Sequence, residues 1–185
     1  MTEPAALAFE DRRYSLPQLE ALTDGLAATL RSRGVAVGQR VAVMASNRPE
    51  FVAAVLAIWR LGASAALISP AWKQHEVEHA LGLVDAAHAV GDHPVLAGLM
   101  PMLDLNEPVA DGDPIPRSGL PEGEAVLVFS SGTTGLPKAV RHTHASLDAA
   151  IRHWRDALQL TNRDRIQVTT PPAHILGLLN ILTAL

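Results

Sequence analysis

Cysteine is absent from this chain of 185 residues, and aromatic residues make up only 4% of it. The absence of cysteine excludes disulfides, cysteine nucleophiles and thiolate metal sites, and it fits a reducing compartment, for which the cytoplasm is the expected location. Positive charge is also sparse, since the 15 lysine and arginine residues are scattered along a chain of net charge -4. Because no basic stripe is available to follow a nucleic-acid backbone, no nucleic-acid partner is expected.

A long uninterrupted apolar segment is lacking as well. The nearest approach is residues 51–72, which carry a single charge at Arg60. That charge would lie near the centre of a bilayer and Pro70 follows it, so a buried helix and then a buried strand explain the segment better than a membrane span. The amino terminus has no apolar run before a cleavage site and does not resemble a signal peptide. With 48% hydrophobic residues, a soluble globular protein is expected.

Helical and short apolar patterns alternate along most of the chain. Alternation of long helices with short strands predicts an α/β fold, namely a doubly wound, mainly parallel sheet flanked by helices. Pro49 suits the first turn of the second helix, and Asn47 is its expected cap. A small hairpin is predicted at residues 8–15, helices at 16–33, 49–61, 73–84 and 144–158, and strands at 40–45, 64–68, 87–90, 125–129, 138–142 and 165–170.

One long stretch departs from this alternation. Between His93 and Glu124, prolines and glycines interrupt any periodicity. Such interruption is typical of irregular chain, so the stretch is predicted to be a surface connection and not a domain boundary.

Residues 128–140, with the sequence VFSSGTTGLPKAV, carry the most specific chemistry of the chain. Glycines allow backbone N–H groups to turn toward an anion, hydroxyls add donors, and a lysine supplies a mobile positive charge for a polyphosphate. An ordinary turn between two strands is the plainer alternative, but a hairpin needs only about two to five turn residues and no such density of donors. The predicted phosphate-binding residues are Ser130, Ser131, Gly132, Thr133, Thr134, Gly135 and Lys138.

This loop differs from the common P-loop, in which Gly-Lys-Ser/Thr runs directly into a helix. Here Pro137 precedes Lys138 and Ala139 follows it. Proline disfavours helical geometry at the residue before it, and the following residues have an extended pattern, so the loop is predicted to join two strands. A GTPase or an ordinary kinase is therefore disfavoured.

Residues 130–138, Ser-Ser-Gly-Thr-Thr-Gly-Leu-Pro-Lys, resemble the phosphate-loop signature of the adenylate-forming superfamily, which includes acyl- and aryl-CoA ligases, luciferases and adenylation domains. Downstream, Thr143-His144 is similar to a pair that follows this loop in the family, and residues 172–177 resemble its Pro-x-x-His-x-x-Gly element. The family's opening is matched in order by Tyr14-Ser15 and residues 38–43, 47–51 and 61–63. The resemblance covers nearly the whole chain.

The resemblance implies a reaction and a set of site residues. Residues 130–134 and Lys138 would hold the β- and γ-phosphates of ATP with Mg²⁺ nearby, and His174 would lie between the nucleotide and the acyl pocket. Lys138 and His174 are the expected catalytic residues, and no metal ligand is identified. A carboxylate would attack the α-phosphate to give an acyl-adenylate and pyrophosphate, after which CoA would displace AMP to form a thioester. Electrostatic positioning dominates such chemistry.

Two departures from the family pattern bear on these expectations. Ala139 and Ala173 stand where the family often has a glycine and an aromatic residue, and the second change is expected to alter the shape of the acyl pocket. The chain also ends at Leu185, before the family's adenine, magnesium and ribose elements and its small carboxy-terminal domain with the catalytic lysine. Residues 1–185 are therefore expected to be the amino-terminal part of the large AMP-binding domain, and a sheet cut short there predicts self-association.

Two classes of function remain open from the sequence. The first is an acid:CoA ligase, not complete in this chain alone, for which the apolar run at residues 175–185 favours a hydrophobic acid such as a fatty acid. The second is a non-catalytic nucleotide-binding or assembly fragment. ATP binding without pyrophosphate exchange would distinguish the second from the first.

A third and more remote class of function is a zinc metallopeptidase, because His75-Glu76-Val77-Glu78-His79 fits the pattern His-Glu-x-x-His. The charged Glu78 is out of place in a buried metal helix and no third ligand is identifiable. A solvent-facing helix with apolar residues inward explains the same spacing. His142 and His144 could likewise pair on a metal, although surface or packing roles explain them without one.

Overall fold

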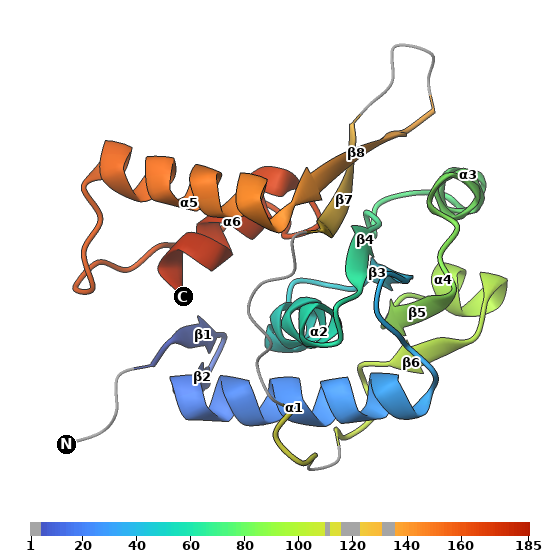
Figure 1. Ribbon diagram of the computed structural model, residues 1–185, viewed down its shortest axis with the longest axis horizontal. Helices are drawn as coiled ribbons and strands as arrows, with labels where there is room; N and C mark the ends of the chain where they lie inside the picture. Colours follow the sequence, from blue (N-terminus) through green and yellow to red (C-terminus); the bar gives the residue numbers. More distant parts are fainter. Residues whose placement is uncertain (1–4, 110–111, 116–122, 131–135) are drawn as a thin grey trace.

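A six-stranded sheet forms the centre of the part of the chain that the structure describes (Figure 1). The computed structural model describes residues 5–109, 112–115, 123–130 and 136–185. The strand order is β6-β5-β3-β4-β7-β8, and all neighbours are parallel except the antiparallel pair β7–β8. This confirms the doubly wound, mainly parallel sheet. The strands are β3 (Arg40–Met44), β4 (Ser64–Leu67), β5 (His88–Gly91), β6 (Met102–Asp104), β7 (Glu124–Ser130) and β8 (Lys138–Thr143).

Helices cover both faces of this sheet. The connection from β3 to β4 moves one way across the sheet and the connection from β4 to β5 moves back, so right-handed crossovers put α2 and α3 on opposite faces. In Figure 1, α1 and α2 lie on one side of the strands, and α3 and α4 lie on the other. The helices are α1 (Leu16–Ser32), α2 (Pro49–Arg60), α3 (Gln74–Val84), α4 (Pro94–Leu99), α5 (His144–Leu158) and α6 (Ile175–Ala184).

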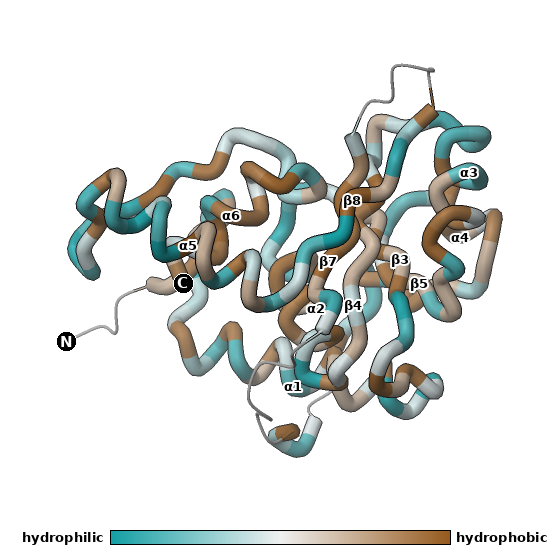
Figure 2. The backbone as a smooth tube through the Cα atoms, turned by 45° about the horizontal axis from the view of Figure 1, so that its top comes forward, coloured by the Kyte–Doolittle hydropathy of each residue, from teal (hydrophilic) through white to brown (hydrophobic). Residues whose placement is uncertain are grey.

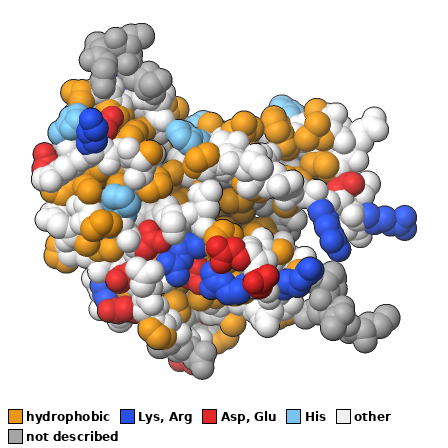
Figure 3. All heavy atoms as spheres, turned by 180° about the vertical axis from the view of Figure 1, so that it is seen from behind, with side chains coloured by type: hydrophobic (Ala, Val, Ile, Leu, Met, Phe, Trp, Pro, Cys, Tyr) orange, Lys and Arg blue, Asp and Glu red, His pale blue; other side chains and the backbone are white. Residues whose placement is uncertain are grey.

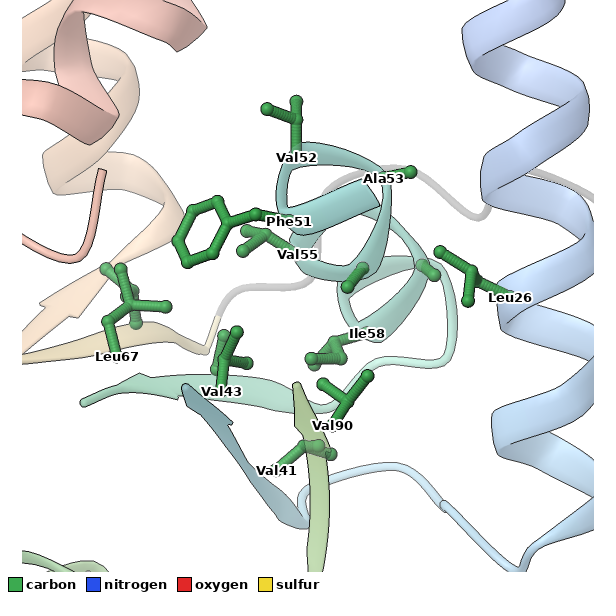
Figure 4. Packing of buried hydrophobic residues seen from close by; sticks show 14 of the residues in the cluster. Leu26, Val41, Val43, Phe51, Val52, Ala53, Val55, Ile58, Leu67 and Val90 are labelled. Atoms are coloured by element: carbon green, nitrogen blue, oxygen red, sulfur yellow. The ribbon is translucent and has the colours of Figure 1, made fainter. Parts of the chain in front are cut away.

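The main core lies between the sheet, α2 and α1. Figure 4 shows Ile58 of α2 directed at the strands and Phe51 extending toward the side where Leu67 lies, while Leu26 of α1 approaches α2 from another flank. These four side chains are at most 1% exposed. Burial of an aliphatic or phenyl side chain contributes about 1.5–3 kcal/mol. Figure 2 shows hydrophilic and hydrophobic residues mixed along α1, a composition that suits a helix with one face on the core and one face on the solvent.

The amino-terminal elements agree closely with the predicted pattern. The hairpin of β1 (Leu7–Phe9) and β2 (Arg12–Tyr14) turns through Glu10, whose φ is 52°. Ser15 then begins α1 with a capping box, because its hydroxyl accepts from the Gln18 N–H and the Gln18 side chain accepts from the Ser15 N–H. The helix ends just before Gly34, whose φ of 93° suits glycine.

The predicted cap of α2 is wrong by one residue. Arg48, not Asn47, is the N-cap, and the Arg48 side chain makes no capping hydrogen bond. Pro49 occupies the first turn as predicted, where the missing N–H costs nothing.

The prediction of an irregular connection from His93 to Glu124 is also wrong in its first part. This stretch contains α4, where the His93 ring nitrogen accepts from the Val95 N–H and Pro94 opens the helix. It then adds β6 to the edge of the sheet, where Leu103 is the register partner of Val90. Both elements are shorter than a periodic pattern can reveal, and proline at a helix start is compatible with helix.

The predicted strand at residues 165–170 does not form in the structure. Val168 packs against the main core, which explains the apolar spacing. No strand within the described ranges is hydrogen-bonded to this segment, and a strand is defined by such pairing. Within the same ranges, no helix is long and apolar enough to cross a membrane.

Candidate functional site

The tip of the β7–β8 hairpin brings two predicted site residues together. Ser130 ends β7, Lys138 begins β8, and the two are register partners. Both side chains are exposed, and no side chain in the described part of the chain bonds to the Lys138 ammonium. The other predicted loop residues, Ser131, Gly132, Thr133, Thr134 and Gly135, lie outside the described residues.

An open groove of about 530 Å³ runs beside β8 on the α3 side. Leu127 and Ala139 contribute apolar surface, and Lys138 and Pro137 lie at the end nearest the predicted loop. Arg40, His79, Leu83, Leu136 and Arg141 complete the lining.

The opposite end of the hairpin is closed by ion pairs around Glu124. Its carboxylate accepts from Arg40 Nε at 2.7 Å, from Arg40 Nη2 at 3.0 Å and from Ser64 Oγ at 2.8 Å, while Arg141 Nε lies 2.6 Å away. Burial alone would raise the pKa of Glu124, but these hydrogen bonds and the charge of Arg141 outweigh it and hold the pKa below its ordinary value. In the sequence, the only signal for this cluster is a charged residue, Glu124, directly before the apolar run of a buried strand.

The Thr143-His144 pair lies at the start of α5, where both side chains make contacts that stabilise the fold. The Thr143 hydroxyl accepts from the Ser146 N–H at 3.1 Å as the helix cap. His144 is buried edge-on against the Trp59 ring, with centroids 5.2 Å apart, and burial lowers its pKa. The imidazole is therefore neutral at neutral pH, and it does not form a pair with His142 among the described contacts.

His174 lies at the start of α6, as its N-cap, with an exposed side chain. A Cβ at Gly177 would come within 2.4 Å of the Pro171 carbonyl oxygen, so only glycine allows this close approach of α6 to the chain before it. Within the described ranges, no hydrogen bond joins His174 to Ser130 or Lys138. The apolar side of α6 packs on α2, where Leu178 and Ile181 are buried, so core packing accounts for much of the apolar run at 175–185.

The switch point of the sheet is filled by paired charges. Adjacent strands β3 and β5 are followed by helices on opposite faces, the place where doubly wound sheets often bind ligands at the carboxyl ends of strands. Here the Ser46 N–H donates to Asp92 at 3.0 Å, and Arg48 donates to Asp92 at 3.2 Å and to Glu50 at 2.8 Å. The exposed cluster of acidic and basic side chains in Figure 3 likewise mixes both signs.

The His-Glu-x-x-His motif does not assemble a metal site. Glu76 accepts from the Lys73 N–H at 2.8 Å as part of the start of α3, and His79 approaches the Pro137 carbonyl oxygen at 3.1 Å. His75 is exposed. Among the residues that the structure describes, no group of three or more His, Asp or Glu side chains could hold a metal ion. Val77, Ala80 and Val84 are buried, which agrees with the prediction of a helix that exposes one face to solvent and turns its apolar residues inward.

A family model described as AMP-binding enzyme matches residues 2–185. The chain belongs to this family. The resemblance drawn from the signature at residues 130–138 is thereby confirmed, and it extends over nearly the whole sequence.

Relatives of this AMP-binding chain include tyrocidine synthase 2 of Brevibacillus parabrevis, 31% identical over 89% of this chain and 5% of that protein. Long-chain-fatty-acid–CoA ligase FadD13 of Mycobacterium tuberculosis is 28% identical over 93% of this chain and 38% of its own length. The solved structure of O-succinylbenzoate coenzyme A synthetase (MenE) from Bacillus subtilis, in complex with ATP and magnesium ion, is 26% identical and superposes with a TM-score of 0.88. That match covers 98% of this chain and 51% of the synthetase. The chain thus spans about half the length of this relative, and less of the curated ones.

Proposed function

We propose that this chain contributes the phosphate-binding part of an ATP-dependent acid–thiol ligase, which converts a carboxylic acid to an acyl-adenylate and then to a CoA thioester. The observation that carries the proposal is the hairpin tip, where Lys138 and Ser130 are adjacent, exposed and unpaired within the described residues, at the two ends of a signature typical of the family. Membership of the AMP-binding family and the CoA ligases among the relatives support it.

The exposed groups at the hairpin tip fit a polyphosphate. An ammonium group without a carboxylate partner has its N–H donors free to bind an anion, and a hydroxyl adds a donor beside it. Mg²⁺ would arrive with ATP, because it is held largely by phosphate oxygens and water in such sites. We therefore assign the β- and γ-phosphates to the loop at 130–135 and Lys138.

In the proposed reaction, a carboxylate oxygen bonds to the α-phosphorus of ATP and the bond from that phosphorus to the bridging oxygen breaks, releasing pyrophosphate. Lys138 would stabilise the negative charge that develops on the leaving pyrophosphate. The thiol sulfur of CoA then bonds to the acyl carbon, AMP leaves, and the thiol proton passes to solvent. We assign to His174 a position beside the acyl group, on the basis of the element at residues 172–177.

The acid is proposed to carry an apolar body. Leu176, two residues after His174, is 43% exposed although α6 is otherwise packed against α2 and α5. FadD13 is named for long-chain fatty acids and MenE for O-succinylbenzoate, so fatty and aryl acids are the two classes to test first.

Carboxylate-dependent exchange of pyrophosphate into ATP, measured over a panel of fatty and aryl acids, tests the proposal. Lys138→Ala is expected to lower the exchange rate by about 100-fold or more, the magnitude for loss of a group that stabilises transition-state charge. Lys73→Ala is the matched control, since Lys73 and Lys138 are the two lysines of the chain and Lys73 is exposed at the N-cap of α3. ATP binding without exchange in the unsubstituted chain would favour the non-catalytic nucleotide-binding alternative.

Chemical labelling gives a second test that does not need turnover. An acyl-phosphate derivative of ATP transfers its acyl group to a lysine amine beside the bound phosphates, and mass spectrometry identifies the labelled peptide. Because the chain has two lysines, labelling of Lys138 that is competed by ATP is the expected result. Equal labelling of Lys73 and Lys138, unaffected by ATP, would contradict a phosphate site at the hairpin tip.

A further inference from the structure

The two strands that flank the predicted phosphate loop are supported from the same side by one short segment of the chain. On β7, Phe129 packs edge-on against Trp72, with ring centroids 5.2 Å apart and an interplanar angle of 74°. On β8's side, Nε2 of His79 lies 3.1 Å from the carbonyl oxygen of Pro137. Trp72 precedes α3 and His79 lies within it. One segment, residues 72–79, therefore contacts β7 before the loop and Pro137 after it.

The contact of His79 has a defined direction. A backbone carbonyl oxygen only accepts hydrogen bonds, so the hydrogen must be carried by Nε2 of His79. Proline fixes its own φ, and its carbonyl belongs to the same planar peptide unit as the Lys138 N–H. A bond to this oxygen therefore fixes the orientation of the Pro137–Lys138 peptide and the point from which the Lys138 side chain leaves the strand.

We propose that His79 is a positioning residue of the nucleotide site. It acts through the Pro137–Lys138 peptide and does not touch ATP, while Trp72 steadies Phe129 on the neighbouring strand. The second histidine of the His-Glu-x-x-His pattern thus has a role in place of metal binding. The inference rests on the proposed function where it concerns ATP, and on the hydrogen bond alone where it concerns the geometry of Lys138.

Three substitutions separate this role from simple filling of the groove wall. His79→Leu removes the donor and keeps an apolar body, whereas His79→Gln presents an amide N–H at about the same reach as Nε2. His75→Leu is the control, because His75 is exposed on the same helix and belongs to the same motif. Because His79 acts only through the Pro137–Lys138 peptide, the net contribution of one hydrogen bond is the upper limit of its effect on binding. ATP affinity, measured by calorimetry, is expected to fall about 3- to 10-fold in His79→Leu and to stay within about twofold of the unsubstituted chain in the other two. Equal affinities in His79→Leu and His79→Gln would overturn the proposal.

Nuclear magnetic resonance gives a readout independent of ATP. At about pH 9, the ¹⁵N shifts of His79 are expected to show the tautomer with hydrogen on Nε2. The backbone amide signal of Lys138 is expected to move in His79→Leu and to return in His79→Gln. A His79 tautomer with its hydrogen on Nδ1, or a Lys138 amide chemical shift that is the same in both variants as in the unsubstituted chain, would overturn the positioning role. If the unsubstituted chain fails to bind ATP, the proposed function fails, and these two NMR results still decide on His79.

Discussion

The β7–β8 hairpin has two ends with opposite chemistry. At its base, Glu124 is surrounded by Arg40, Ser64 and Arg141, and its side chain is 12% exposed. At its tip, Lys138 and Ser130 are exposed and have no side-chain partner within the described residues. Polar groups that are paired inside the protein stabilise the fold, whereas polar groups that are left unpaired at a surface are available to a ligand. The comparison therefore predicts that stability depends on the base of the hairpin and nucleotide binding on its tip.

The largest expected effect on stability comes from Glu124→Ala. It would leave the Arg40 guanidinium and the buried Ser64 hydroxyl without their acceptor, and we expect the free energy of unfolding to fall by about 2–3 kcal/mol. Denaturant unfolding measures this, with Glu107→Ala as the exposed-carboxylate control, expected within about 0.5 kcal/mol of the unsubstituted chain. Lys138→Ala should also stay within that range. A comparable loss of stability in Lys138→Ala would break the distinction between the two ends.

A smaller effect is expected when Glu124 is neutralised by acid. Its pKa in the folded protein lies below the ordinary value of 4.5, so the folded state favours the charged carboxylate. The resulting stabilisation is fully present above pH 4.5 and is lost as the pH falls through the lowered pKa of the folded state. Glu50 and Asp92 have lowered pKa values as well, and they contribute in the same direction.

Comparison with Glu124→Gln isolates the share that belongs to the base of the hairpin. Unfolding free energies measured from about pH 6 to about pH 3 should fall less steeply in Glu124→Gln, because the amide does not titrate in this range. Identical slopes in the two proteins would show that acid destabilisation arises elsewhere, for example at the switch point between β3 and β5.

Much of the fold could be predicted from the sequence because its elements have strong local patterns. The hairpin before Ser15, the helix from Leu16 and the helix from His144 each combine regular apolar spacing with a capping residue or a turn. The failures have equally local causes. β6 and α4 are too short for a period to appear, and residues 165–170 have a strand-like pattern without a described partner strand to pair with.

The candidate site could be predicted only in part. Loop chemistry is visible in sequence because the hydroxyls, glycines and lysine are consecutive. The residues that support the hairpin are not visible in this way, because they are far apart in the sequence. His79 contacts Pro137 at a separation of 58 residues, and Arg40 contacts Glu124 at a separation of 84 residues. Such partners are set by strand order and crossover direction, so they follow from the fold and not from any local motif.

The smallest loss of stability that we expect at the base of the hairpin comes from Arg141→Ala, which tests whether this base is held from within the sheet or from its outer edge. The Arg141 side chain is 65% exposed on the edge strand, while Arg40 holds the same carboxylate with two hydrogen bonds from β3. Exposed ion pairs contribute little because water and salt screen them, so the loss should be about 0.5 kcal/mol and should shrink further in high salt. Denaturant unfolding at low and high ionic strength measures both quantities. If Arg141→Ala lowered the free energy of unfolding as much as Glu124→Ala, the stabilising contact of Glu124 would lie at the edge of the sheet. Stability at the base of the hairpin would then depend on an exposed residue, as nucleotide binding does at its tip.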